Sequence, residues 1–210
     1  MNNSYEIDKL RAQQFGLTAT IKDDSGKEHH FYRGHEYVKI GGVKWAVTNV
    51  GAEKETNSGL YFAFGEAQGY TAEQVRSGKR KFNENGHTNV NFDSVKAYWG
   101  EKWRMPTEAE FQALLSSTTH KWVYNYQGSG ADGRLFTDKT DWSKNLFFPA
   151  VGYGYYGNMY DVGSVGYYWS SSLSALGVVA SRSFRFDNRF SRINDYYCFI
   201  GFSVRGVFGE

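Results

Sequence analysis

The segment from Phe148 to Val207 holds most of the residues that could bind a ligand. Six tyrosines fall between Tyr153 and Tyr168, and four aromatic residues fall between Tyr196 and Phe202, among serines, glycines, asparagines and arginines. Tyrosine offers a large contact area with only two side-chain torsions to freeze, and its mixture with Ser, Gly and Asn is typical of antibody-like binding surfaces. The composition therefore predicts a binding face rather than a catalytic site.

Other residues could support catalysis or metal binding, but each has a simpler explanation. Glu108 and Glu110 could act as paired carboxylates, yet Thr107 and Glu110 form a capping box and both acids favour a helix N-terminus. His29 and His30 are adjacent, so on a strand they point to opposite faces and make a poor metal pair.

The sequence has a single cysteine and none of the catalytic motifs considered, so it gives no sign of an enzyme. Cys198 is the only cysteine, which excludes an internal disulfide and a thiolate zinc cluster. The GSGADG run at 128–133 lacks the Lys-Ser/Thr of a phosphate-binding loop, and no HExxH, GxSxG or Cys/His zinc pattern occurs. We therefore expect no enzymatic activity, no catalytic residues, no cofactor and no metal.

Bulk properties narrow the range of partners. A chain of 210 residues fits one domain with a small appendage, and a net charge of +2 gives no reason to expect nucleic acid. The Lys/Arg-rich stretch at 69–92 is interpreted as a solvated loop. No stretch approaches the roughly 20 apolar residues of a membrane span, and the N-terminus has no signal-peptide core, so we expect no membrane insertion.

Short strands and two helices must position the binding segment. Phe184 and Phe186 alternate with Ser183 and Arg185, as in a half-buried strand, and Trp169 is expected in the core. Residues 187–200 show no regular hydrophobic period, as expected for a surface whose residues are set by a ligand rather than by packing in the core. The other expected elements are a hairpin at 17–32, a hairpin turning at Gly41-Gly42, a strand in 59–67, helices in 92–100 and 103–115, a hairpin at 120–137 and a strand in 145–153.

Six spaced motifs carry a family resemblance. GHEYVKIGGVKWAVTNVGA, GLYFAFGE, WGEKWRMPTEAEFQALL, FFPAVGY, VGSVGYYWSSS and GFSVRGV, in that order, resemble the Fibrobacter succinogenes major paralogous domain. They are also similar to the variable proteins of diversity-generating retroelements, especially those of gut Bacteroidales and their phages. The resemblance covers about residues 35–210.

The resemblance implies an α+β fold of the C-type lectin type, related to formylglycine-generating enzyme. It would have short antiparallel strands, two flanking helices and a C-terminal segment that displays the ligand face. Residues 35–210 would form this lectin-like variable domain, and residues 1–34 an N-terminal arm or connector.

The resemblance also implies which residues vary. In that family, error-prone reverse transcription replaces adenines, so that Asn codons become codons for Tyr, Phe, Ser, Asp, Ile, Val, Cys, Gly or Arg. The ligand-binding set carried over to this chain is Tyr155, Tyr156, Asn158, Tyr160, Asp161, Val165, Tyr167, Arg182, Ser183, Arg185, Asn188, Arg189, Arg192, Asn194, Tyr196, Tyr197 and Phe199, with Cys198 and Ile200 as further diversified positions. The scaffold set is Gly163, Gly166, Trp169, Phe184, Phe186, Gly201, Val204 and Arg205.

The expected function is that of a ligand- or receptor-binding protein, a phage tail adhesin or a host-surface adhesin. Its partner would be a protein or glycan receptor on a cell surface, and it would act on a virion tail or outside a cell, as a homo-oligomer or as part of a larger particle. Three alternatives stay open. They are a metal-independent carbohydrate-binding lectin-like protein, a structural decoration domain without a ligand, and an oxidase of the formylglycine-generating type, which by resemblance needs a pair of redox cysteines where this chain has one.

Overall fold

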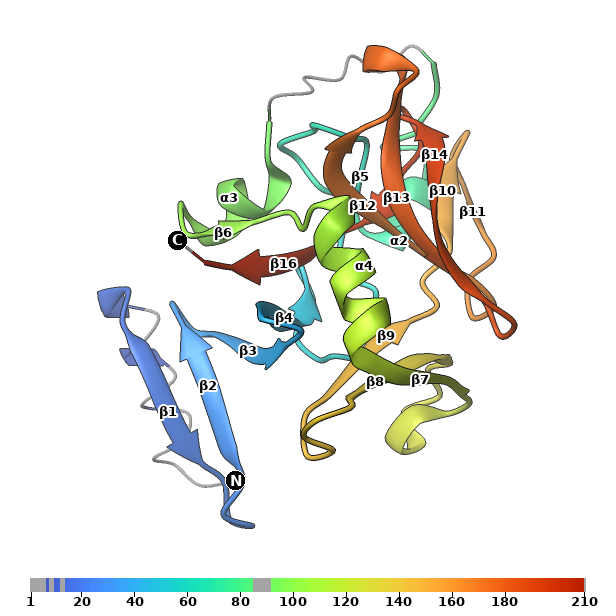
Figure 1. The fold of residues 1–210 in the computed structure, drawn as a ribbon. Coiled ribbons are helices and arrows are strands. Elements are labelled where there is room, and N and C mark those ends of the chain that lie inside the picture. The colour runs from blue at the N-terminus through green and yellow to red at the C-terminus, as the bar shows by residue number, and fades with distance from the viewer. Residues whose placement is uncertain (1–6, 8–9, 12–13, 85–91, 210) are drawn as a thin grey trace.

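Short strands account for most of the ordered backbone. The structure is a computed structural model that describes residues 7, 10–11, 14–84 and 92–209 (Figure 1). Strands take 42% of the chain and helices 16%, in a β-sandwich-like arrangement of curled sheets. The expected α+β fold of the C-type lectin type is therefore wrong. The helix signals in the sequence yield only short helices, while the period-2 segments, together with one stretch expected to be irregular, build the sheets.

The largest sheet has six strands. In spatial order they are β1 (Thr18–Lys22), β2 (Glu28–Tyr32), β3 (His35–Ile40), β4 (Val43–Asn49), β16 (Arg205–Phe208) and β6 (Trp103–Arg104). The hairpin expected at 17–32 is confirmed as β1 and β2, and β2 pairs with β3, so both strands continue the same sheet. The division of the chain at residue 35 stays a prediction.

A second, five-stranded sheet carries the segment of interest. In spatial order its strands are β14 (Ser191–Tyr197), β13 (Ala180–Phe186), β12 (Gly166–Leu173), β15 (Phe202–Ser203) and β5 (Tyr61–Phe62). Strand β14 occupies half of the stretch expected to lack regular structure. It pairs with β13 along its whole length. The backbone hydrogen bonds to β13 stabilise this strand although its side chains show no period-2 pattern.

Two smaller sheets complete the β-structure. The three-stranded sheet orders β7 (Thr118–Val123), β8 (Gly133–Asp138) and β9 (Asn145–Pro149), and the two-stranded one pairs β10 (Tyr153–Tyr155) with β11 (Asn158–Tyr160). The hairpin at 120–137 and the buried strand in 145–153 are confirmed by β7 to β9. Ile40 pairs directly with Val43, which confirms the two-residue turn at Gly41-Gly42, where both glycines have positive φ.

Capping residues mark an end of each of the three α-helices whose bounds the structure defines. Helix α4 (Glu108–Ser117) starts at Thr107, whose side chain and that of Glu110 form the expected capping box. Helix α3 (Ser94–Trp99) ends at Gly100 as expected. Helix α2 (Ala72–Arg76) lies inside the stretch interpreted as a solvated loop, so that part of the interpretation is wrong. A second capping box, Thr71 with Gln74, marks its start. Residues 85–91 of the same stretch lie outside the described residues.

No described helix has both the length and the apolar character needed to cross a membrane.

The two faces of the five-stranded sheet pack into two different cores. Tyr168, Phe184 and Phe186 join the core that includes Phe111 of α4, and ring centroids of Phe111 and Phe184 lie 4.7 Å apart. Side chains of the opposite face, among them Tyr167, Trp169 and Phe202, pack into a second core. Figure 1 shows α4 next to β12 and β13, which it contacts.

The last two strands join the two large sheets. Strand β15 lies between β12 and β5 in one sheet, β16 lies between β4 and β6 in the other, and only Val204 separates them in sequence. Arg205 follows directly and is fully buried. Its guanidinium donates to Asn49 Oδ1 at 2.8 Å and to the carbonyl oxygens of Ala46 at 3.1 Å and Phe147 at 3.1 Å, and also to that of Val47. Arg205 thus belongs to the frame, as its assignment to the scaffold predicts.

Candidate functional site

An aromatic cavity of about 550 Å³ opens where the five-stranded sheet meets the β10–β11 hairpin. We call it the tyrosine pocket. Strand β10 contributes two of its residues, β12 one, β14 two, the turn leading into β15 two and β15 itself one, and Glu84 completes the lining. The lining residues are Glu84, Tyr153, Tyr155, Tyr167, Tyr196, Tyr197, Phe199, Ile200 and Phe202.

Tyr167 lies at the centre of a packed ring cluster. Its ring stacks on Phe202 with centroids 5.0 Å apart, and it meets Tyr153 edge-on at 5.1 Å and Tyr196 edge-on at 5.5 Å. Its hydroxyl donates to Asp161 Oδ2 at 3.0 Å. Burial, above all, raises the pKa of Tyr167, so this phenol stays protonated at neutral pH. The contacts fix the ring before any ligand arrives.

A second group of rings forms the more exposed side of the pocket. Phe199 stacks on Tyr197 at 5.3 Å with an interplanar angle of 8°, and lies 6.1 Å from Tyr155 at 23°. Tyr156 packs edge-on against Tyr155 at 4.6 Å. Tyr197 keeps 57% of its surface exposed. These rings are therefore available to a ligand while each remains supported by a neighbour.

Glu84 places a carboxylate at this rim. It accepts hydrogen bonds from the Tyr156 hydroxyl and, at 3.4 Å, from the Tyr155 hydroxyl. The Tyr156 hydrogen bond is the main reason that the pKa of Glu84 lies below its usual value, and the same bond is the main reason that the pKa of Tyr156 rises to about 12. At neutral pH the rim therefore carries one negative charge beside neutral phenols.

Two arginines extend the site along the sheet towards the β13–β14 turn. The Arg185 guanidinium lies 5.8 Å from the Tyr167 ring centroid and 5.2 Å from that of Phe190, and Arg192 lies 4.6 Å from Phe190. We call Arg185, Phe190 and Arg192 the arginine ridge. Asp187 fixes the position of Arg185 relative to the β13–β14 turn. Its carboxylate accepts a hydrogen bond from Arg185 Nη1 at 2.8 Å and also accepts from two backbone N–H groups of the turn.

The structure brings a large part of the expected ligand-binding set together. Tyr155, Tyr167, Tyr196, Tyr197 and Phe199 line the tyrosine pocket. Other members lie beside it or on the ridge. These are Tyr156, Asn158, Tyr160 and Asp161 in and after the β10–β11 hairpin, Arg185 and Arg192 on the ridge, and Asn188 and Arg189 in the β13–β14 turn. Asn194, on β14, lies opposite Ser183 in the register of the sheet.

Val165 and Ser183 lie away from the solvent. Val165 keeps 8% of its surface and Ser183 none. Ser183 pairs with Trp169 on β12 and with Asn194 on β14, so neighbouring strands flank it on both sides, and Val165 belongs to the second core. Neither side chain reaches a ligand at the surface in this arrangement.

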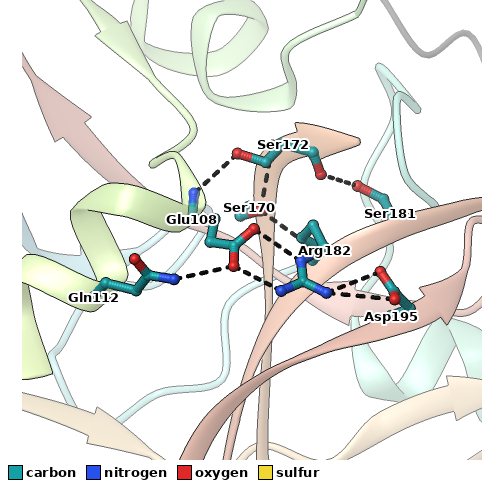
Figure 2. Close-up of polar contacts among 7 residues, drawn as sticks. All are labelled: Glu108, Gln112, Ser170, Ser172, Ser181, Arg182 and Asp195. Carbon is teal, nitrogen blue, oxygen red and sulfur yellow. Dashed lines mark hydrogen bonds and ion pairs between the residues drawn. The ribbon is translucent and has the colours of Figure 1, made fainter. Parts of the chain in front are cut away.

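Arg182 faces the other side of the sheet and ties it to α4 (Figure 2). Its Nε and Nη2 atoms donate to the two carboxylate oxygens of Glu108 at 2.8 Å and 2.6 Å, and Nη1 reaches Asp195 at 3.3 Å. The Arg182 hydrogen bonds are the main reason that the pKa of Glu108 is lowered. Alternation along β13 explains the placement, because Arg182 has the parity of Phe184, and Arg185 that of Ser183. Arg182 therefore contributes to the frame.

Several residues of the pocket and of the ridge were absent from the expected set. Tyr153 and Phe202 belong to the aromatic clusters of the sequence, and Phe190 lies between arginines that were selected, so composition alone could have included them. Glu84 gave no signal, because it precedes its partner Tyr155 by 71 positions and only the fold brings the two together.

Cys198 lies at the end of β14 and is buried. Burial raises the pKa of its thiol to about 11, so the thiol stays protonated at neutral pH and lacks the thiolate form that nucleophilic or redox chemistry requires. Within the described part of the chain, no group of three or more His, Cys, Asp or Glu side chains is arranged to hold a metal ion.

Comparison with known proteins adds no relative: no family model, no curated protein and no solved structure matches this chain.

Proposed function

We propose that this protein binds a ligand or receptor through the tyrosine pocket and the arginine ridge. The observation that carries the proposal is convergence. Five positions selected from the sequence, spread from Tyr155 to Phe199, line one cavity. A cavity of this size lined by aromatic rings and a few polar groups is the usual form of a small-ligand or side-chain binding site.

The energetics of the site support binding. Tyrosine and phenylalanine rings supply contact area at a low entropic cost, and rings already fixed by their neighbours lose little further freedom on binding. Arg185 and Arg192 add donors that form charge-assisted hydrogen bonds to carboxylate or phosphate groups. Weak single sites would gain from several copies acting together, as on a particle or a cell surface.

The proposal includes the origin and the setting of the site. We propose that retroelement diversification produced the pocket residues, and that the protein is an adhesin of a phage tail or a host cell surface whose partner is a receptor on another cell. The neighbouring DNA tests the first part. A near-copy of the 3′ coding region, differing at adenines and placed beside a reverse-transcriptase gene, is expected. A 3′ region without such a copy would contradict diversification.

A pair of matched double variants tests the binding function. The pocket variant carries Tyr197→Asn and Phe199→Ser, and the control carries Tyr124→Asn and Trp142→Ser, two side chains that are 67% and 81% exposed and lie outside the pocket. Fluorescently labelled protein is measured by flow cytometry on a panel of Bacteroidales cells. Because interface aromatics often contribute about 1–2 kcal/mol each, the pocket variant should bind at least about tenfold more weakly.

Thermal unfolding of the same proteins separates binding from folding. Both variants should keep their melting temperature within roughly 5 °C of wild type, since the substituted rings face solvent. Equal loss of cell binding in the pocket variant and the control would contradict the proposal. So would loss of the folded state in the pocket variant, because the site would then belong to the frame.

A further inference from the structure

We infer that the tyrosine pocket takes an organic ammonium group, and a trimethylammonium group in particular. The inference rests on the proposed function, since it names the chemistry that the same pocket would recognise. Three observations carry it: the sign of the pocket's charge, the arrangement of its rings and the existing hydrogen-bond partners of two of its hydroxyl groups.

The charge of the pocket is negative. Glu84 is the only lining residue that is charged at neutral pH, and the other lining side chains are phenols, phenyl rings and one isoleucine. Its carboxylate is held by hydroxyl groups of Tyr155 and Tyr156 and not by an ion pair with any described lysine or arginine. Phenol donors orient a carboxylate without cancelling its charge, so an incoming cation meets an uncompensated anion.

The rings surround the cavity with planes of different orientation. Phe199 and Tyr155 lie within 23° of parallel, whereas Tyr167 stands at 72° to Tyr153 and at 88° to Tyr196. Aromatic faces carry negative electrostatic potential, and several rings at such angles around a small cavity form the cage that binds alkylammonium groups through cation–π contacts.

Two of the pocket hydroxyl groups already have partners. The hydroxyls of Tyr155 and Tyr167 donate to Glu84 and Asp161, so they could donate to a polyhydroxylated ligand such as a sugar only if those bonds were broken. A quaternary ammonium has no donor to satisfy. The cavity of about 550 Å³ also leaves room for the chain that bears the ammonium group.

The Arg185 guanidinium does not reverse this picture. Arg185 lies 5.8 Å from the Tyr167 ring but does not line the pocket, and its Nη1 atom pairs with Asp187 at 2.8 Å. Its charge is therefore partly balanced by an acid of its own turn.

Isothermal titration with choline and with 3,3-dimethylbutan-1-ol tests the inference, because the two compounds have the same shape and differ in charge. Wild type should bind choline at least about fivefold more tightly than the neutral alcohol. Glu84→Gln should remove most of that preference and leave the affinity for the alcohol unchanged. The control is Glu101→Gln, whose side chain is 92% exposed and outside the pocket, and it should behave as wild type.

Further arms of the titration identify the source of the ammonium group. Phosphocholine represents a lipid- or glycan-linked headgroup, and a short peptide with trimethyl-lysine represents a protein. Equal affinity of wild type for choline and the alcohol, or tighter binding of the alcohol, would overturn the inference. If that occurs while the Tyr197→Asn/Phe199→Ser variant still loses cell binding, the ammonium assignment falls and the binding function stands. If wild type prefers choline but the Tyr197→Asn/Phe199→Ser variant binds cells as well as wild type does, the ammonium assignment stands and the proposed receptor function falls.

Discussion

The two faces of the five-stranded sheet use the same strands for different tasks. Tyr168 and Phe184 are fully buried in the core that includes Phe111 of α4. Tyr167 and Arg185, each adjacent to one of them in sequence, belong to the pocket and the ridge. Because successive side chains on a strand point to opposite faces, a ligand-facing residue can change while its neighbour keeps the sheet in place. At Tyr167–Tyr168 and at Phe184–Arg185, frame and binding positions are thus neighbours in sequence that lie on opposite faces of the sheet.

The arginines of the molecule show the same separation. Arg182 pairs with Glu108 on the α4 side, whereas Arg185, three positions later, stacks on Phe190 on the pocket side. Arg205 is fully buried between the sheets. Residue type alone therefore does not identify a binding position, because the role of each arginine depends on where in the fold its side chain lies.

The largest expected effect comes from the face that packs on α4. Phe184→Ala should lower the free energy of unfolding by about 3–5 kcal/mol, because it removes a fully buried ring and leaves a cavity beside Phe111. Tyr197→Ala, in the pocket, should cost less than about 1 kcal/mol. Urea denaturation of both variants gives the comparison. Similar losses for the two would mean that the exposed rim of the pocket belongs to the frame.

Among the arginines, the largest effect is expected at Arg205. Arg205→Leu should lower the free energy of unfolding by about 2–4 kcal/mol, because three carbonyl oxygens and Asn49 lose their donor, while relief from burying a charge offsets part of the loss. Arg192→Ala, on the exposed ridge, should change stability by less than about 0.5 kcal/mol. Calorimetry of both proteins measures this difference, and an Arg192→Ala variant as unstable as Arg205→Leu would place the ridge in the frame.

The smallest effect concerns the link between Arg182 and Glu108. The pKa of Glu108 is lower in the folded than in the unfolded protein, so its contribution is present above the unfolded pKa and is lost as pH falls through the folded pKa. Glu108→Gln should cost less than about 1 kcal/mol at pH 7, since both side chains remain partly exposed. Wild type and variant should converge in stability below the usual range of a glutamate pKa.

Urea titrations at pH 7 and in acid measure that convergence. Glu101→Gln is the control, because Glu101 is 92% exposed, and its stability should follow wild type at every pH. A Glu108→Gln variant that differs from wild type by the same amount at pH 7 and in acid would show that the ion pair does not stabilise the fold.

Local signals predicted elements better than they predicted their assembly. The turn at Gly41-Gly42 and the capping box of Thr107 with Glu110 depend on contacts within a few residues, and both are confirmed. The fold class was wrong, because sheet order depends on pairings that no short stretch encodes. Strand β14 was missed for a related reason, since its side chains alternate only weakly between buried and exposed positions.

The candidate site shows the same limit at finer scale. Composition identified Tyr155, Tyr197 and Phe199, which line the pocket. It could not assign Ser183 to the interior, because a serine between two strands carries no hydrophobic signal of its own burial. Glu84 was out of reach, since its place beside the rings depends on the whole path of the chain.

The position of β15 and β16 has a consequence for synthesis. Both strands lie inside their sheets, and both follow most of the pocket-lining residues in the sequence. During translation neither large sheet can close until residues 202–208 have left the ribosome. Any product that stops before residue 202 lacks both of these interior strands and would be exposed to proteolysis. Only a chain translated through residue 208 can therefore present the folded tyrosine pocket.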